Sequence, residues 1–427
     1  MNGRSATTGG RRIVRLANFV TESSGGLRTA LRQLGAGYAA AGHEPVLVVP
    51  GRQDSDELTG QGRVVTVASP AVPGMGGYRV LLDRRRLVRL LRELRPDRLE
   101  ISDRTTLRWT GRWAREQGIP TVMVSHESLD GLLRLSTRGR FGAVGLADRL
   151  NTRTVASHDR IVCTTGWAAA EFRRIGAPDL HQVPLGVDLR HFHPDRYDPE
   201  LRAAHAGTDE LLLLHCGRLS PEKRPERSLA ALAELRARGV PAVLLVVGDG
   251  PRRDRLRATA ARHGLPVRFL RYVADRDRLA RLLATADVLI APGPVETFGL
   301  AALEALASGT PVVASAESAL PEVLGAAGLA ATGAGTAYAD AVLALAARPA
   351  GERRTAARQQ AERYPWSASV AGFLAAHDLP VGPPARDLPL GPGPVVPPTT
   401  RLPAGPPATG LPAGPAVPAV PVTSGDR

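Results

Sequence analysis

Residues 292–315 read PGPVETFGLAALEALASGTPVVAS, and their pattern indicates the fold class. A strand-sized apolar run, residues 288–291, precedes this stretch, and a second one, residues 311–314, lies at its end. Residues 299–308, between the two runs, have a helical pattern. A strand, a glycine-bearing turn, a helix and another strand form the repeating unit of a parallel sheet covered by helices.

The same unit recurs in both halves of the chain. We expect strands at residues 13–19, 45–49, 64–67, 98–102, 121–125 and 160–164 in the first half, and at residues 211–215, 242–247, 267–270, 288–291 and 311–314 in the second. Helical patterns fall between strands, as at residues 27–41, 227–239 and 277–286. The sequence therefore predicts an α/β protein with two Rossmann-like domains built on parallel sheets.

Shifts in composition divide the chain. The boundary between the two domains lies near residues 182–194. We therefore expect Rossmann-like domains at residues 12–188 and 189–364, after a flexible start at residues 1–11. We expect residues 365–378 to form a C-terminal helix that packs back on the first domain. Residues 379–427 are mostly proline, glycine, alanine and valine, which predicts a disordered or polyproline-like tail. Its Pro-x-x-Pro patterns fit either a passive extension or the binding of an SH3-like partner.

The overall composition excludes several classes of protein. With 427 residues, 43% of them hydrophobic and 22% charged, the chain has room for sizeable cores and is not disordered throughout. The formal net charge of +14 favours anionic partners such as nucleotides, nucleic acid or acidic lipid head groups. Two cysteines, Cys163 and Cys216, cannot build a disulfide framework or a zinc site, and they indicate a reducing compartment.

Neither secretion nor a membrane span is predicted. Residues 1–12 are polar and basic with no apolar stretch behind them, and no segment has the roughly 20 apolar residues that cross a bilayer. We therefore expect a cytoplasmic protein, with a peripheral position on the inner face of the plasma membrane as an open alternative. The helix predicted within residues 81–96 has leucines on one side and many arginines, which fits either an anionic lipid surface or an ordinary domain helix.

The turn at Glu296 predicts a binding site for a phosphate-containing ligand. A helix begins near Phe298 and Gly299, and its free N–H groups and positive dipole end attract anions. The carboxylates of Glu296 and Glu304 can accept hydrogen bonds from hydroxyl groups. Such a pair suits a ligand that has sugar on both sides of a diphosphate. The alternative is two surface glutamates on a helix, and the full sequence context favours the binding site.

A second cluster supplies positive charge. A strand ends at Gly217, and Arg218 and Lys223 follow, where they can neutralise a diphosphate. The alternative is a basic loop that caps the next helix. The turn at Gly25 and Gly26 follows the first strand, and its missing side chains allow the backbone to approach a ligand.

These motifs together resemble the retaining glycosyltransferases of family four, and the resemblance covers residues 12–377. It implies the GT-B fold, in which two Rossmann-like domains face each other across a cleft, the first binding the acceptor and the second a nucleotide sugar. The resemblance assigns the donor diphosphate to Arg218 and Lys223, the ribose hydroxyls to Glu304 and the donor sugar to Glu296. It implies that the backbone near Phe298, Gly299, Leu300 and Gly26 surrounds the phosphates, and that Tyr272 and Val273 contact the base. It also implies that His126 faces the transferred sugar. Without this context, His126 would be interpreted as a helix-capping or solvent-facing histidine.

A closer resemblance, to the actinobacterial phosphatidylinositol dimannoside mannosyltransferases of that family, rests on residues 17–19, 24–30, 76–79, 99–108 and 124–127. It implies transfer of an α-mannosyl unit from GDP-mannose, a co-substrate, to a mannosylated inositol phospholipid. The alternative is a GT-B enzyme with another nucleotide-sugar donor or a soluble acceptor. Scarce aromatic residues and the lack of a recognised binding module argue against a nucleic-acid-binding protein.

The family resemblance also implies retention of the anomeric configuration without a tightly bound cofactor. Retaining glycosidases use a nucleophilic carboxylate, but the family pattern supplies no equally clear nucleophile. In a front-face route, the departing diphosphate helps to take the proton of the acceptor, and Arg218 and Lys223 stabilise the leaving group.

No motif requires a divalent metal. Asp275-Arg276-Asp277 fits an Asp-x-Asp metal pattern, but its position before a helix favours capping. The sequence departs from the family at Thr164-Thr165, where many relatives carry serine, and in the proline-rich tail. We expect neither departure to touch the donor site.

Overall fold

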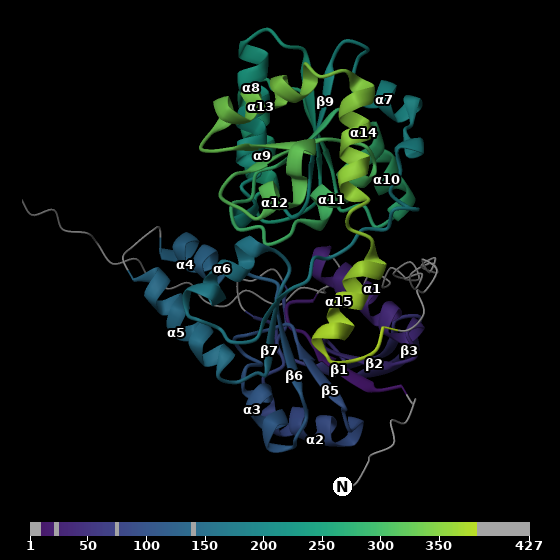
Figure 1. The fold of residues 1–427 in the computed structure, drawn as a ribbon. Coiled ribbons are helices and arrows are strands. Elements are labelled where there is room, and N and C mark those ends of the chain that lie inside the picture. The colour runs from purple at the N-terminus through teal and green to yellow at the C-terminus, as the bar shows by residue number, and fades with distance from the viewer. Residues whose placement is uncertain (1–9, 21–24, 73–76, 138–141, 382–427) are drawn as a thin grey trace, which may run out of the picture. The chain divides into compact units, whose positions relative to one another are not determined.

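The computed structural model describes residues 10–20, 25–72, 77–137 and 142–381. Most of the predicted flexible start and most of the predicted proline-rich tail therefore lie outside the described residues. Ser24 and Gly76, which belong to two of the predicted motifs, also lie outside them. The described chain forms two mainly parallel β-sheets covered by helices, which confirms the predicted fold class (Figure 1).

The first sheet has eight strands in the order β3-β4-β2-β1-β5-β6-β7-β8. Neighbouring strands run parallel, except for the antiparallel pair of β3 and β4. The strands are β1 (Arg12–Leu16), β2 (Glu44–Gly51), β3 (Ser55–Thr59), β4 (Gly62–Ala68), β5 (Arg98–Ile101), β6 (Thr121–Ser125), β7 (Arg160–Cys163) and β8 (Leu180–Gln182).

The second sheet has six strands in the order β11-β10-β9-β12-β13-β14, all parallel. The strands are β9 (Leu211–Cys216), β10 (Ala242–Val247), β11 (Val267–Leu270), β12 (Val288–Ala291), β13 (Val312–Ser315) and β14 (Gly328–Ala331). The order runs outward in both directions from β9 and β12, as in nucleotide-binding α/β folds. Because the direction of winding reverses there, the carboxyl ends of β9 and β12 mark the place at which open α/β sheets bind ligands.

Helices connect the strands. In the first half they are α1 (Gly26–Ala40), α2 (Arg84–Leu94), α3 (Trp109–Glu116), α4 (Leu129–Thr137), α5 (Ala143–Val155) and α6 (Gly166–Arg174). In the second half they are α7 (Pro199–His205), α8 (Glu226–Ala237), α9 (Arg253–Arg262), α10 (Arg276–Thr285), α11 (Leu300–Ala307), α12 (Leu320–Leu324), α13 (Gly335–Ala346), α14 (Ala350–Ala361) and α15 (Trp366–Ala376). Three short 3-10 helices are η1 (Pro194–Arg196), η2 (Pro221–Lys223) and η3 (Gly325–Ala327).

All the predicted strands form, but three further strands were not predicted. β3 reads SDELT and is largely exposed at the edge of the sheet, so it lacks the apolar alternation that identifies a strand. β8 has three residues, which is too short for a periodic signal. β14 reads GLAA and has no β-branched or aromatic residue. These strands form because neighbouring strands offer backbone partners, not because of their own composition.

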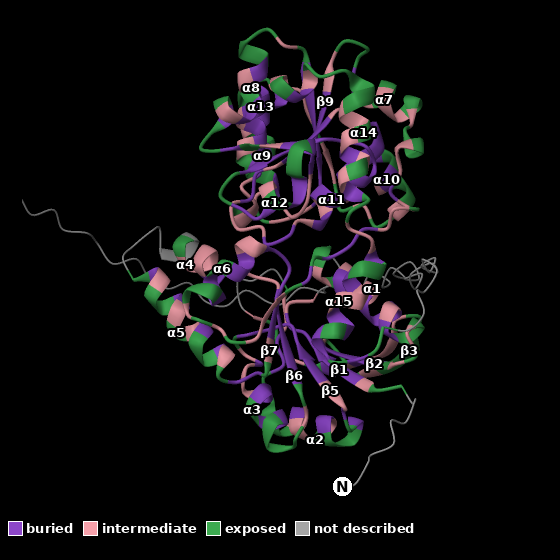
Figure 2. Cartoon of the chain, viewed as in Figure 1, coloured by how far each residue is buried: buried purple, intermediate pink, exposed green. Residues whose placement is uncertain are grey.

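The core lies within the sheets and on the inner faces of the helices, where Figure 2 shows buried residues. β10, for example, reads AVLLVV and is buried throughout, as expected for a strand covered on both faces. The leucines of α2, Leu87, Leu91 and Leu94, are buried in the core of the first sheet. The ordinary-domain-helix interpretation therefore accounts for these leucines, because they are not available to a lipid surface. Among the described residues, no helix is both long and apolar enough to span a bilayer.

The C-terminal helix α15 packs against α1 and β7 (Figure 1). His377, just after α15, lies with Nε2 3.2 Å from the carboxylate of Glu100 on β5. Glu100 also accepts hydrogen bonds from Arg15 Nε at 2.8 Å and from the Tyr38 hydroxyl at 2.7 Å. Burial opposes ionisation of Glu100, but Arg15 and His377 hold the pKa of this carboxyl well below its ordinary value.

The last described residues continue this packing. Leu379, which we assigned to the tail, is 7% exposed and belongs to the apolar core. Its N–H donates to the carbonyl of Leu374, and the preceding Asp378 forms an ion pair with Arg160 at 2.7 Å. The ordered chain therefore extends past the predicted start of the tail.

Candidate active site

The candidate site lies at the carboxyl edge of the second sheet, where β9 and β12 end as neighbours. β9 leads into Gly217 and Arg218, and β12 leads into the turn that carries Glu296. This is the edge at which open parallel sheets bind ligands. Two motifs that are about 80 residues apart in the sequence are therefore adjacent in the structure.

The two motifs meet in an ion pair between Lys223 and Glu296. Lys223 ends η2, and its Nζ lies 2.7 Å and 2.5 Å from the two carboxylate oxygens of Glu296. The two side chains are 33% and 25% exposed, so the pair is partly shielded from water but a ligand can still reach it. Both predicted residues therefore belong to one charged site.

Two helices begin beside each other at this site. α11 begins at Leu300 and α1 begins at Gly26, and a methyl group added at Gly26 would lie 3.9 Å from Leu300 Cδ1. Gly299, before α11, has φ +80°, and a Cβ atom there would lie 2.4 Å from Leu320 Cδ2, so only glycine fits. Because each helix start carries free N–H groups and a partial positive charge, the two starts together favour an anion.

Glu304 lies on α11, further from the turn. Burial raises its pKa to about 7, with Arg276 lowering the pKa and Asp188 raising it. Arg276 and Asp188 form an ion pair at 3.6 Å. The nearby thiol of Cys216 is also buried, which raises its pKa to about 12 and keeps it protonated at neutral pH. Glu304 therefore changes charge near neutral pH.

The residues predicted to contact the base, Tyr272 and Val273, follow β11. Tyr272 is 47% exposed, whereas Val273 packs against the apolar core. Arg32 of α1 lies within electrostatic reach of both Tyr272 and Arg276, and burial lowers its pKa. Tyr272 therefore lies near Arg276, which also lowers the pKa of Glu304. In the described part of the chain, no hydrogen bond joins Tyr272 to Glu304.

Arg218 makes a contact that the sequence did not predict. Its guanidinium lies 4.8 Å from the ring centroid of Tyr78, a cation–π contact between the two halves of the chain. Tyr78 also packs edge-on against Phe19, with centroids 6.0 Å apart. A single aromatic residue in a loop has no periodic signal, which is why we assigned Tyr78 no role from the sequence.

His126 follows β6 and contacts the second half of the chain through its backbone. Its Nε2 lies 3.3 Å from Ser102 Oγ, and its carbonyl accepts a hydrogen bond of 2.7 Å from the Thr297 hydroxyl. Burial lowers the pKa of His126 to about 4, so the imidazole is neutral at pH 7. Because Thr297 follows Glu296 directly, this hydrogen bond fixes the position of His126 relative to the charged pair.

The expectation that Thr164 and Thr165 lie away from the donor motif is wrong. Both hydroxyls donate to the carbonyl of Thr297, at 3.3 Å and 3.0 Å. Nearby, the carboxylate of Glu322 accepts from the N–H groups of Gly166 and Trp167, at 2.9 Å and 3.1 Å, and so caps α6. These contacts join segments more than 130 residues apart, which a single sequence does not indicate.

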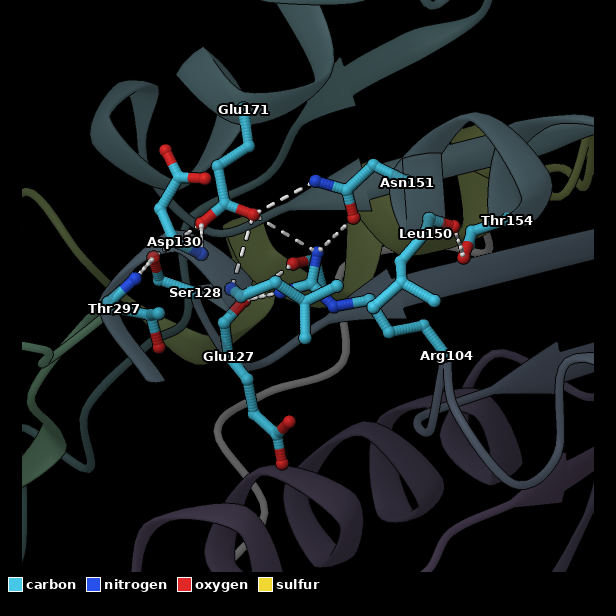
Figure 3. A network of polar contacts seen from close by, with 12 residues as sticks. Arg104, Glu127, Ser128, Asp130, Leu150, Asn151, Thr154, Glu171 and Thr297 are labelled. Carbon is cyan, nitrogen blue, oxygen red and sulfur yellow. Dashed lines mark hydrogen bonds and ion pairs between the residues drawn. The ribbon is translucent and has the colours of Figure 1, made fainter. Parts of the chain in front are cut away.

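A buried polar network surrounds the backbone at Glu127 and Ser128, just after His126 in the chain (Figure 3). Glu171 accepts hydrogen bonds from Ser128 Oγ, from the N–H of Leu129 at 3.2 Å and from Asn151 Nδ2 at 3.1 Å. Arg104 lies 3.5 Å from the same carboxylate and donates to the carbonyl of Glu127. The network therefore holds the backbone that follows β6.

The Asp-x-Asp sequence acts as a helix cap, as predicted. The Asp275 carboxylate accepts hydrogen bonds from the N–H groups of Asp277 and Arg278, at 2.9 Å and 3.2 Å, and begins α10. Among the described residues, no group of three or more histidine, cysteine, aspartate or glutamate side chains could hold a metal ion.

Two protein-family models match the chain. The model described as "Glycosyl transferase 4-like domain" matches residues 25–186, and the model described as "Glycosyl transferases group 1" matches residues 198–364.

The chain is also similar to named proteins. The GDP-mannose-dependent alpha-(1-6)-phosphatidylinositol dimannoside mannosyltransferase of Mycobacterium tuberculosis (strain CDC 1551 / Oshkosh) is 49% identical over 367 residues, which cover 85% of this chain and 95% of that protein. A GDP-mannose-dependent alpha-mannosyltransferase of Mycolicibacterium smegmatis is 30% identical over 282 residues, 64% of this chain and 71% of that protein.

Solved structures share the fold. Sucrose-phosphate synthase from Thermosynechococcus elongatus superposes with a TM-score of 0.69 at 22% identity, covering 86% of this chain and 98% of that one. HepE from Anabaena, solved in complex with UDP and glucose, superposes with a TM-score of 0.67 at 17% identity, covering 86% of this chain and 99% of that one.

Proposed function

Because the chain belongs to the glycosyltransferases, with a 4-like first domain and a group 1 second domain, we propose that it transfers an α-mannosyl unit from GDP-mannose to a phosphatidylinositol mannoside. The donor and acceptor are those in the name of the 49% identical mycobacterial relative. The observation that carries the proposal is the Lys223–Glu296 ion pair at the carboxyl edge where two helices begin.

The geometry supports a division of labour around the donor. Lys223 and Arg218 supply positive charge to the diphosphate, and the N–H groups near Phe298, Gly299, Leu300 and Gly26 complete its cradle. Glu296 accepts hydrogen bonds from the donor sugar, and Glu304 accepts them from the ribose. Tyr272 and Val273 contact the base, and His126 faces the transferred sugar as a neutral imidazole.

The proposed reaction retains the configuration at the sugar carbon. The bond from the sugar C1 to the diphosphate oxygen breaks, and a bond from C1 to the acceptor oxygen forms on the same face. The acceptor proton passes to the departing diphosphate, whose growing negative charge Lys223 and Arg218 stabilise. We propose that these cations and the two helix starts make a divalent metal unnecessary, so that transfer persists in EDTA.

We propose that the enzyme works at a membrane surface, because the proposed acceptor is a lipid. The apolar side of α2 is buried, but Arg85, Arg89 and Arg92 are exposed on its outer side. Such arginines favour an anionic bilayer electrostatically, without insertion of apolar side chains. We propose a peripheral, salt-sensitive attachment, which flotation with and without acidic phospholipid would measure.

The test is transfer of radiolabelled sugar to lipid. The protein should move label from GDP-mannose, and not from UDP-glucose or UDP-mannose, into an extract containing phosphatidylinositol dimannoside. Labelling from a UDP-sugar, or labelling of a water-soluble acceptor alone, would replace the proposal with a related glycosyltransferase activity. No labelling from any nucleotide sugar would contradict both.

A further inference from the structure

The carboxyl ends of three adjacent strands, β1, β5 and β6, meet at one edge of the first sheet. In open parallel sheets this is the edge that faces a ligand. A polar residue stands two positions beyond the end of each strand, and these residues are Asn18, Asp103 and Glu127. None of the three has been assigned to the donor.

Two of these residues, Asn18 and Asp103, are hydrogen-bonded to each other. Asn18 Nδ2 donates to the Asp103 carboxylate at 2.9 Å, and Asn18 Oδ1 accepts from the N–H of Leu81 at 2.9 Å. Asp103 also accepts from the hydroxyl of Thr105 at 2.6 Å. Asn18 and Asp103 are buried, so they form part of the framework and are not free for a ligand.

The third residue, Glu127, differs. Its side chain is partly exposed, and Figure 3 shows its carboxylate directed away from the Glu171 network. Within the described ranges, no hydrogen bond or ion pair reaches this carboxylate. The hydrogen bonds that Glu127 accepts there go to its backbone carbonyl. Burial raises the pKa of Glu127, with Arg104 lowering the pKa and Asp103 raising it.

The backbone around Glu127 is held from both sides. Its carbonyl accepts hydrogen bonds from buried Arg104 and, at 3.1 Å, from Ser125 Oγ. The carbonyl of the preceding His126 accepts from Thr297. A carboxylate on a fixed backbone loses little entropy when it binds a ligand, so it can contribute to selection of that ligand.

A partly buried carboxylate that makes no ion pair with any described residue is stabilised by a ligand that donates hydrogen bonds. It opposes a ligand that brings a phosphate beside it. Among the substrates of the proposed reaction, the hydroxyl groups of the acceptor sugar fit this requirement, because Glu296 and Glu304 already serve the hydroxyls of the donor. Glu127 also follows a strand of the first sheet, whereas Lys223, Glu296 and Glu304 follow strands of the second.

We propose that the Glu127 carboxylate accepts hydrogen bonds from the hydroxyl groups of the acceptor sugar and is a specificity-determining residue for the acceptor. This inference rests on the proposed function. Glu127→Gln keeps the shape of the side chain and removes its charge. Asp130→Asn is the matched control, because Asp130 is a carboxylate three residues further on that pairs with Arg174 at 2.9 Å.

The experiment measures both substrates in the full-length protein. Calorimetry gives the affinity for GDP, and steady-state transfer from GDP-mannose gives the KM for phosphatidylinositol dimannoside in mixed micelles. Glu127→Gln should raise the acceptor KM by about tenfold or more, and it should leave the GDP affinity within about twofold of wild type. Asp130→Asn should leave both quantities within about twofold of wild type.

The outcomes separate the two proposals. An unchanged acceptor KM in Glu127→Gln, with normal GDP binding, overturns the role of Glu127 and leaves the proposed function standing. Equal losses of acceptor and GDP affinity also overturn it, since a general distortion of the site would explain them. A wild-type protein that binds no GDP contradicts the proposed function and this inference with it.

Discussion

At the scale of single residues, the site consists of charges that are paired with each other and lie within reach of a ligand. Lys223 and Glu296 are each only partly exposed, so their attraction is stronger than that of a surface pair. A lysine has three donors, so Lys223 can contact a diphosphate while it keeps one bond to Glu296. The pairing therefore orients both groups before the donor binds.

Substitution of Lys223 tests this arrangement. Lys223→Ala should weaken GDP binding by about 10- to 100-fold, because a charge-assisted hydrogen bond contributes roughly 1.5–3 kcal/mol. Calorimetry measures the affinity. Arg271→Ala, which removes an equal charge from a side chain that is 81% exposed, is the control and should bind GDP like wild type. Equal affinities of Lys223→Ala and wild type would remove Lys223 from the site.

Glu304 gives the protein a specific pH dependence. Its pKa in the folded protein is about 7, above the ordinary value of 4.5, so the folded state favours the protonated carboxyl. The resulting stability is fully present below pH 4.5 and is lost as the pH rises to about 7, a change of roughly 3–4 kcal/mol. Glu304→Gln should lack this component. Denaturant unfolding of both proteins from pH 4.5 to pH 8 checks it, and parallel pH curves would contradict it.

At the scale of elements, the turn between β12 and α11 connects the two halves of the chain. Thr297 donates to the carbonyl of His126 and accepts from the hydroxyls of Thr164 and Thr165. The first residue of α11 also lies beside the first residue of α1. One short segment thus positions the Glu296 carboxylate, a helix start and the backbone beside Glu127.

Loss of the Thr297 hydroxyl should affect turnover more than donor binding. Thr297→Val removes the hydrogen bond to His126 but keeps the backbone carbonyl and the shape of the side chain. We expect kcat to fall by about tenfold, the value of one positioning hydrogen bond, with GDP affinity within about twofold of wild type. Thr297→Ser should restore turnover. If Thr297→Ser is as slow as Thr297→Val, the hydroxyl is not the cause.

For the molecule as a whole, local patterns predicted the fold and located the motifs around Gly217 and Glu296. Each local pattern is contained within about two dozen residues and can be recognised there. The sequence therefore predicted the strand–turn–helix units, the glycine turns and the position of Glu296 in a turn. The sequence did not predict contacts between distant segments. The Arg218–Tyr78 contact, the bonds of Thr164 and Thr165 to Thr297, and the capping of α6 by Glu322 depend on how the halves meet.

Two truncations at the C-terminal end of the chain test its contributions to stability and to catalysis separately. A protein that ends at residue 381 keeps His377 and Leu379, and it should retain the kcat/KM and melting temperature of the full chain. A protein that ends at residue 376 loses the His377 contact to buried Glu100 and the core packing of Leu379. It should unfold at a lower temperature, because a buried carboxylate loses one of its hydrogen-bond partners and apolar surface is exposed. Thermal unfolding and transfer assays test both, and a large catalytic loss at residue 381 would give the tail a role in the reaction.

In the proposed site, the cations and the helix starts bind a diphosphate. Calorimetry of the wild-type protein with GDP and with GMP tests it most directly, since the two ligands differ by one phosphate. We predict one binding site with an affinity for GDP about tenfold or more above that for GMP. Equal affinities for the two nucleotides, or no heat of binding for either, would contradict the account.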